Sequence, residues 1–158
     1  MKRNFIILIG VIVILFAVSS CEKTVEQSDV YEITVELKSN ADGTLAVATY
    51  NDLAGKFKST DAVLVYAYVD DDAWMAMPGI SYDGEYHYYE FNDDGGFLFM
   101  ATPSSGYVWT GNFTMDYRIV RIPNIVFTEK KAEGVDHNNY SEVMKAYNLY
   151  EGNVIMKK

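Results

Sequence analysis

The residue with the most specific chemistry in this chain is its single cysteine, Cys21. A thiolate is a strong nucleophile, so a cysteine without a second thiol is suited to a thioether rather than a disulfide. Two serines precede Cys21, and before them an apolar run extends from Phe5 to Val18, behind Lys2 and Arg3. This run is shorter than the ~20 residues that a helix needs to cross a membrane. A basic start, an apolar run and small residues together predict a secretory signal.

The junction VSSC, residues 18–21, resembles a bacterial lipobox. The resemblance implies that Cys21 is alkylated with diacylglycerol, that residues 1–20 are removed as a signal peptide, and that the new amino terminus is acylated, with palmitate as the expected chain. Two or three acyl chains, at ~0.8 kcal/mol per buried CH₂, attach a protein stably to a bilayer. Glu22 stands where aspartate favours inner-membrane retention in some bacteria, so we expect an outer-membrane lipoprotein, facing either the periplasm or the outside. The alternative is a simple secretory signal with an incidental cysteine.

Aromatic side chains form the second group of candidate residues, since the chain holds 13 tyrosines and two tryptophans. In the stretch GEYHYYEF, the alternation of a strand places Tyr86 and Tyr88 on one face. Tyr107 and Trp109 follow in GYVWTG. Exposed rings beside carboxylates are surfaces on which sugars stack, and tyrosine is equally common at protein interfaces. These four rings are therefore candidate binding residues for a glycan or an envelope protein; the alternative is that they belong to the core.

The other reactive side chains form no recognisable catalytic or metal-binding motif. The acidic turns 70–72 and 92–94 lack the alternating spacing with which carboxylates converge on Ca²⁺. His87 and His137 have no cysteine or histidine neighbour at a zinc-binding spacing. The motifs G-x-S-x-G, H-E-x-x-H, G-x-G-x-x-G and the phosphate loop are also absent from the sequence. We therefore expect no cofactor, no metal and no catalytic activity. A small glycan-active enzyme is the alternative, because an acid-rich chain always offers paired carboxylates.

The charge of the chain restricts its partners. Net charge is −9, and it becomes −11 when Lys2 and Arg3 leave with the signal. So acidic a protein repels phosphate backbones and anionic headgroups, which argues against nucleic acid and anionic lipid as partners. With no thiol left after lipidation of Cys21, buried apolar and aromatic side chains must stabilise the domain.

The periodicity of the sequence predicts that strands position these residues. After the lipidated cysteine and a polar tether over residues 21–29, we expect one domain over residues 30–158. Apolar and polar side chains alternate in VYEITVELK, as in a half-buried strand, and an Asp-Gly turn follows. Further strands are expected in TLAVATY, DAVLVYAYVD, AWMAM, EYHYYEF, FLFMAT and NFTMDYRIVRIP.

One late segment has the spacing of a helix instead. Tyr140, Val143, Met144 and Tyr147 recur at i, i+3, i+4 and i+7, and Asn139 is suited to cap the first turn. About seven strands and one short C-terminal helix predict a mainly β protein. The expected architecture is an antiparallel β-sandwich of Ig-like or jelly-roll-like type.

Three stretches give the chain a family resemblance: STDAVLVYAYVDDDAWMAMP, FTMDYRIVRIP and VDHNNYSEVMKAYNL. They resemble a family of small uncharacterised lipoproteins of the Bacteroidota, in which a signal and a lipobox precede a short β domain that ends in a helix. Many of these relatives carry a collagen-like Gly-Pro-Pro run after the cysteine, where this chain has EKTVEQSD. The resemblance implies a membrane-anchored envelope lipoprotein, and we expect its domain to be a non-catalytic binding or structural module.

Overall fold

The computed structural model describes residues 26–69, 73–92, 96–150 and 154–157. The expected signal peptide, Cys21 and the first part of the tether lie outside the described residues. The same holds for the acidic turn 70–72 and for Asp93 and Asp94 of the second acidic turn. Among the described residues, no helix is both long and apolar enough to span a bilayer.

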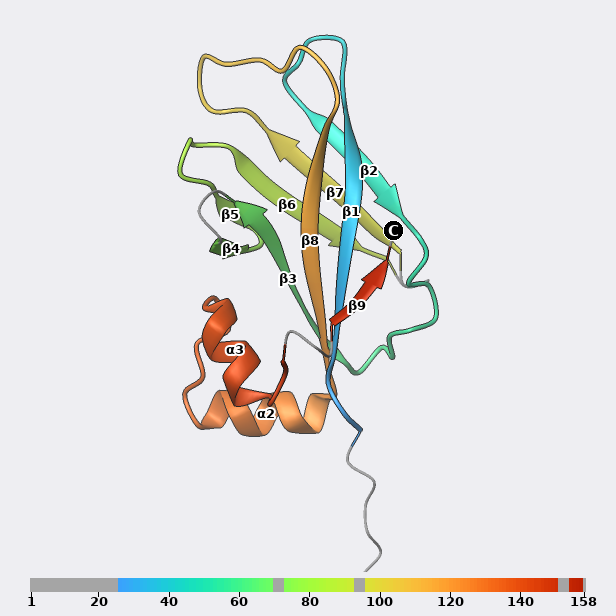
Figure 1. The fold of residues 1–158 in the computed structure, drawn as a ribbon, viewed down its shortest axis with the longest axis vertical. Coiled ribbons are helices and arrows are strands. Elements are labelled where there is room, and N and C mark those ends of the chain that lie inside the picture. The colour runs from blue at the N-terminus through green and yellow to red at the C-terminus, as the bar shows by residue number, and fades with distance from the viewer. Residues whose placement is uncertain (1–25, 70–72, 93–95, 151–153, 158) are drawn as a thin grey trace, which may run out of the picture.

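Nine strands build one continuous, mainly antiparallel sheet (Figure 1). In chain order they are β1 (Asp29–Ser39), β2 (Ala46–Tyr50), β3 (Ala62–Val69), β4 (Ala73–Ala76), β5 (Gly79–Ile80), β6 (Tyr86–Phe91), β7 (Phe97–Thr102), β8 (Phe113–Ile122) and β9 (Val154–Lys157). Their order across the sheet is β4-β3-β8-β1-β2-β7-β6-β5, and β9 pairs in parallel with the first half of β1. The mainly β, antiparallel class predicted from the sequence is therefore confirmed.

The longest strand, β1, joins the two halves of the sheet. Along most of its length it pairs with β8, from Asp29↔Arg121 to Leu37↔Phe113, and at its end it turns to pair with β2. The predicted alternation holds, because one face of β1 is buried in the interior. Its buried interior residues are Tyr31, Ile33, Val35 and Leu37.

The sheet curls until its two ends meet, which gives a nearly closed, barrel-like shape (Figure 1). β4 and β5 are the outermost strands in the sheet order, yet only Met77 and Pro78 separate them along the chain. The backbone N–H of Met77 donates to the carbonyl of Val65 at 2.9 Å, which holds this link against β3. A single curled sheet thus replaces the predicted packing of two separate sheets, because the twist of successive strands accumulates and brings the ends together.

The interior of the curled sheet is filled by aromatic and branched side chains. Phe97 and Phe99 of β7 stack at 5.7 Å between ring centroids, and Phe99 stacks on Tyr117 of β8 at 4.1 Å. These three rings are fully buried. Their packing stabilises the interior of a chain whose single cysteine cannot form a disulfide within it.

Two helices, α2 (Asn124–Ala132) and α3 (Tyr140–Ala146), cover the outer face of β3 and β8 near the lower end of the molecule (Figure 1). The predicted stripe of α3 is buried as expected, and the Asn139 side chain accepts from the backbone N–H of Glu142. The prediction of one C-terminal helix was wrong, because α2 precedes it. The segment NIVFTEKKA has its apolar residues in one consecutive run and no buried residue, so it carries no helical stripe.

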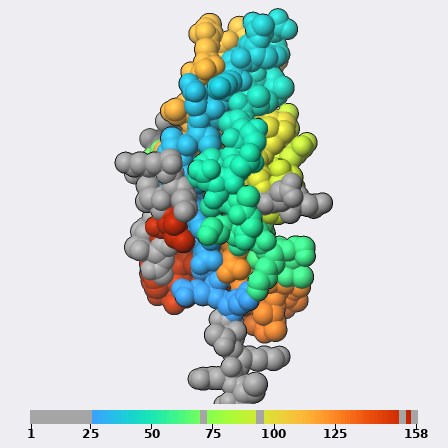
Figure 2. All heavy atoms as spheres, turned by 90° about the vertical axis from the view of Figure 1, so that its right-hand side faces the viewer, coloured from blue at the N-terminus to red at the C-terminus, as the bar shows by residue number. Residues whose placement is uncertain are grey.

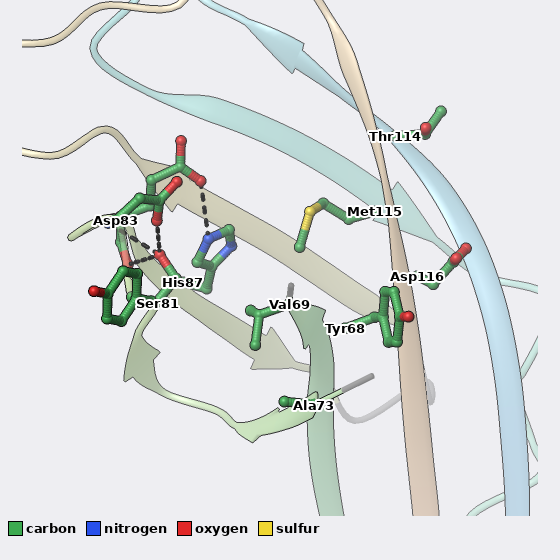
Figure 3. A pocket seen from close by; sticks show the side chains of 11 residues that line it. Tyr68, Val69, Ala73, Ser81, Asp83, His87, Thr114, Met115 and Asp116 are labelled. Carbon is green, nitrogen blue, oxygen red and sulfur yellow. Dashed lines mark hydrogen bonds and ion pairs between the residues drawn. The ribbon is translucent and has the colours of Figure 1, made fainter. Parts of the chain in front are cut away.

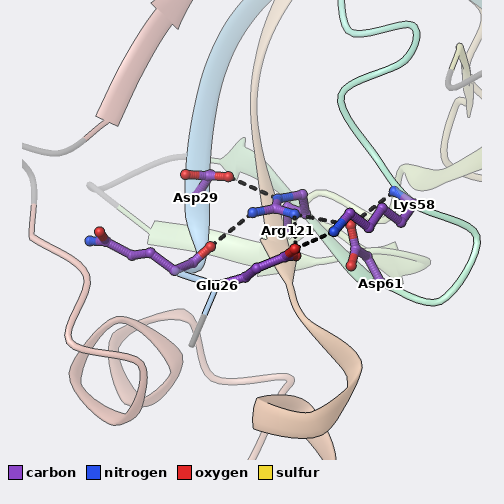
Figure 4. Close-up of polar contacts among 6 residues, drawn as sticks. Glu26, Asp29, Lys58, Asp61 and Arg121 are labelled. Atoms are coloured by element: carbon purple, nitrogen blue, oxygen red, sulfur yellow. Dashed lines mark hydrogen bonds and ion pairs between the residues drawn. The ribbon is translucent and has the colours of Figure 1, made fainter. Parts of the chain in front are cut away.

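A cluster of charged side chains fixes the start of the domain (Figure 4). The guanidinium of Arg121 contacts Asp29 at 2.8 Å and Asp61 at 3.2 Å, and its third nitrogen donates to the carbonyl of Gln27 at 2.9 Å. Lys58 pairs with Glu26 beside it. The chain therefore enters the fold beside the C-terminal end of β8, at the end of the molecule that carries α2 (Figure 2).

Candidate functional site

Strand β6 presents two different surfaces, one outside the curled sheet and one inside. Tyr86 and Tyr88 face outwards, whereas His87 faces inwards and is only 1% exposed. Tyr89 packs on Phe97 in the interior. The alternation predicted from the sequence therefore places the tyrosine pair and the buried histidine on opposite faces of one strand.

The outward-facing pair consists of one exposed ring, Tyr86, and one half-buried ring, Tyr88. The rings of Tyr86 and Tyr88 stack with centroids 5.4 Å apart and an interplanar angle of 24°, and Tyr86 is 41% exposed. Because the rings stack on each other, each covers one face of its neighbour, and contact with a bound molecule is left to the outer faces and the edges. This arrangement offers apolar faces and hydroxyl groups to a bound molecule at the same time.

The other two candidate rings lie in the loop between β7 and β8. Tyr107 is 73% exposed, whereas Trp109 is half-buried and packs against Phe113 at 4.8 Å. The indole N–H of Trp109 donates to Oε1 of Glu85 at 3.0 Å, and its backbone N–H donates to the carbonyl of Gly43. Trp109 thus contacts the inner side of the fold, and no contact joins it to the tyrosine pair among the described residues.

The predicted Asp-Gly turn positions Trp109. Gly43 has φ of +65°, and a Cβ atom at this position would lie 2.3 Å from the carbonyl oxygen of Trp109. Only glycine tolerates both the left-handed backbone and so close an approach. The β1–β2 turn and the loop with Trp109 also border a hollow of about 510 Å³ at the upper tip of the molecule.

A larger cavity of about 680 Å³ opens where β3 diverges from β8 (Figure 3). Pairing of these strands ends at Ala67↔Tyr117, so Val69 of β3 and Met115 of β8 line the gap. The turn between β5 and β6 forms the opposite wall with Asp83, and His87 lies at the inner side. The cavity exists because the curled sheet closes at the link between β4 and β5 and stays open above it.

A hydrogen-bonded chain runs from Trp109 through Glu85 to His87. One carboxylate oxygen of Glu85 accepts from the indole, and the other lies 3.3 Å from Nε2 of His87. Burial lowers the pKa of His87 below its ordinary value, although the neighbouring Glu85 opposes the shift. The imidazole is therefore neutral at pH 7, with its proton on Nε2. Nδ1 is buried and has no hydrogen-bond partner.

The cavity wall carries carboxylates without a cationic side chain. Asp83, Glu85 and Asp116 belong to the lining, and no lysine or arginine does so among the residues that the structure describes. Neutral groups satisfy these acids in part: the Ser81 hydroxyl contacts Asp83, and the Thr34 hydroxyl donates to Asp116 at 2.5 Å. The site is consequently rich in hydrogen-bond acceptors and negative charge.

The sequence alone did not indicate this cavity. Glu85 directly precedes β6 and lies two residues from His87 in the chain, but Trp109 joins them only through the fold. The second histidine lies elsewhere: His137, between α2 and α3 in the chain, hydrogen-bonds with the Tyr147 hydroxyl at 2.7 Å and packs on Phe127 of α2. In the described part of the chain, no cluster of three or more histidine, cysteine or acidic residues could hold a metal ion.

Comparison of the chain with protein-family models, curated proteins and solved structures gives no match. The geometry of the tyrosine pair and of the cavity is therefore the basis for the functional argument.

Proposed function

We propose that this protein is a lipid-anchored protein of the bacterial outer membrane, whose β domain is a non-catalytic binding module. The anchor is acylated Cys21, as the lipobox resemblance implies. The observation that carries the proposal is that β1 starts at the end of the domain opposite to the β1–β2 and β7–β8 loops (Figure 1). The chain between Cys21 and Glu26 spans at most about 18 Å, so the domain stays near the bilayer.

This geometry favours display of the loops away from the membrane. β1 is 11 residues long and rises about 3.3 Å per residue, so its far end lies about 33 Å from its start. The contacts of Arg121 with Asp29 and with the carbonyl of Gln27 hold the chain in this direction where it leaves the domain. The resemblance to the small lipoproteins of the Bacteroidota supports the same arrangement.

The absence of catalysis is supported by the state of the acidic groups in the cavity. Hydrolysis by paired carboxylates requires one acid that is free to give a proton and one that is free to activate water or attack. Glu85 is held by Trp109 and His87, Asp83 by Ser81, and Asp116 by Thr34. These contacts favour a binding role over an enzymatic one.

The anchor is tested in a bacterial host that has an outer membrane. Cys21→Ser is expected to abolish incorporation of tritiated palmitate and to leave a longer chain with an uncleaved signal. Glu22→Gln is the matched control, because it alters the neighbouring residue and retains the thiol. If the Cys21→Ser protein sediments with membranes at the length of the native protein, the proposed anchor is wrong.

The second candidate function is more specific: the domain binds a glycan, and the stacked Tyr86–Tyr88 pair favours this. The flat apolar faces of a sugar stack on such rings, and the tyrosine hydroxyl groups exchange hydrogen bonds with those of the sugar. A glycan array probed with the detergent-solubilised protein tests this. Tyr86→Ala and Tyr88→Ala are each expected to weaken binding about tenfold, the equivalent of ~1.4 kcal/mol.

The matched control for the tyrosine pair is Tyr150→Ala, which removes a ring that is 61% exposed and lies outside the pair. It is expected to leave binding unchanged. Equal losses for all three variants would show that the pair has no special role. If the array shows no bound glycan, and an envelope protein binds in a way that depends on Tyr86 and Tyr88, the ligand of the pair is a protein and not a glycan.

A further inference from the structure

The cavity beside His87 contains a buried hydrogen-bond acceptor that the protein does not satisfy. Nδ1 of His87 has no partner, although the whole residue is 1% exposed. A buried polar group without a partner costs about 1–3 kcal/mol, so such groups are rare in folded proteins and mark sites that water, an ion or a ligand completes.

Contact with Glu85 determines the tautomer of His87, and hence whether Nδ1 donates or accepts a hydrogen bond. Nε2 lies 3.3 Å from a carboxylate oxygen, which can only accept, so the ring proton resides on Nε2. A flipped ring would place a carbon atom against the carboxylate and lose the contact. Nδ1 therefore presents a lone pair and requires a donor. Figure 3 shows that the edge of the imidazole away from Glu85 faces Met115 and Val69, in the cavity.

The charge of the walls selects the kind of donor. Glu85 lies beside Nε2 of His87 with Asp83 on the same side of the ring, Asp116 lies at the β8 side, and the described lining contains no cationic residue. Hydroxyl and indole groups hydrogen-bond to these acids without neutralising their charge. A partly enclosed cavity lined by one sign of charge concentrates the opposite sign, so a cation is favoured over an anion or a neutral molecule.

The apolar part of the cavity wall fits the hydrocarbon portion of an organic cation. Val69, Ala73 and Met115 give an apolar wall for a short hydrocarbon stem, and the ring of Tyr68 lies at the edge. An aromatic face within about 6 Å also attracts an organic cation. A bare metal ion fits less well, because the described residues provide no set of three converging ligands.

We propose that the cavity between β3, β6 and β8 binds a small organic cation, a protonated primary amine on a short aliphatic stem, whose N–H group donates to Nδ1 of His87. This site is separate from the tyrosine pair, because His87 and Tyr86 face opposite sides of β6. The inference therefore stands or falls independently of glycan binding. It gives the protein a second ligand, of a chemical class different from a glycan.

The probe is n-butylammonium, compared with n-butanol and butanoate of the same length. The full chain is titrated in a nonionic detergent, with calorimetry for affinity and the ¹⁵N resonance of His87 Nδ1 for the site. Butylammonium is expected to bind saturably and to shift this resonance, whereas butanol and butanoate bind at least tenfold more weakly. A butanol titration that matches butylammonium would overturn the choice of a cation. An unchanged Nδ1 resonance with all three probes would show that ordered water alone completes the site.

Two variants connect the affinity to the cavity. Asp83→Asn keeps a side chain of the same shape at an exposed position and is expected to weaken butylammonium binding about fivefold or more, since one charge near the ligand is lost. His87→Gln is expected to abolish butylammonium binding, provided that the circular dichroism spectrum of this variant is native.

Glu129→Gln on α2 is the matched control, because it removes the same charge from an exposed site outside the cavity. An equal loss in Glu129→Gln and Asp83→Asn would show diffuse attraction to an acidic protein and refute the site. Failure of Tyr86→Ala to affect butylammonium separates this result from the glycan test.

Discussion

Replacing Arg121 by methionine is expected to destabilise the domain more than any change to its exposed ion pairs. The guanidinium is the only cation within reach of the Asp61 carboxylate among the described residues, at 3.2 Å, and the side chain of Asp61 is 2% exposed. Asp29 contacts the same guanidinium at 2.8 Å. Methionine retains the hydrocarbon stem of arginine, so the substitution removes the charge and its hydrogen bonds while it preserves most of the packing.

The magnitude follows from the burial of Asp61. Removing one partner of a buried ion pair leaves an uncompensated charge and costs about 3–5 kcal/mol. A domain of this size has an unfolding free energy of about 5–15 kcal/mol, so the loss is a large share of the total. At about 4 °C per kcal/mol, the melting temperature would fall by about 10–20 °C. The neighbouring Lys58–Glu26 pair is half-exposed at both ends, so Lys58→Met is expected to cost less than about 1 kcal/mol.

Urea denaturation of the three proteins, followed by circular dichroism, measures these free energies. The double variant Arg121→Met with Asp61→Asn is expected to recover part of the loss, because no buried charge then remains without a partner. If Arg121→Met costs no more than Lys58→Met, the cluster in Figure 4 does not stabilise the domain, and our account of how the chain enters the fold is wrong.

Two further predictions concern the chain from Trp109 to His87. Because burial lowers the pKa of His87, the folded state takes up its proton at lower pH than the unfolded state does. The unfolding free energy should therefore fall as the pH drops below about 6.5, by up to about 1.4 kcal/mol per unit of pKa difference, and His87→Gln should reduce this slope in denaturation curves between pH 7.5 and 5. Trp109→Phe keeps a ring against Phe113 but loses the donor to Glu85, so it should cost about 1.5 kcal/mol by urea denaturation; a loss near zero would mean that water replaces the indole.

Local patterns in the sequence predicted most of the individual elements. The alternation of apolar and polar residues in β1 predicted its buried face, because successive side chains of a strand point to opposite sides. The buried stripe of α3 and its Asn139 cap were also predicted, because both depend on the spacing of residues within one helix. The placement of Tyr86 and Tyr88 on one face of a strand was also predicted, because it depends on the period of a single strand. That this face points outwards follows from the fold alone.

Only the tertiary structure determined how these elements combine. The order of the strands depends on pairings between distant segments, such as β1 with β9, and no local period encodes them. α2 has no buried stripe to reveal it, and its place on the sheet comes from the packing of Val126 and Phe127. The cavity forms because β3 and β8 diverge while the sheet closes at β4 and β5.

In the candidate site, too, the sequence indicated individual residues, and the fold determined their contacts. From sequence, His87 was a strand residue without a metal-binding neighbour, and Trp109 was a candidate for stacking on sugar. In the fold, Trp109 donates its indole proton to Glu85, and Glu85 holds His87 so that Nδ1 faces a cavity. Residue types and spacing determine which face of a strand a side chain occupies, since this depends on neighbours in the chain. Which charge, donor or empty space that face meets depends on segments far apart in sequence, and folding alone brings them together.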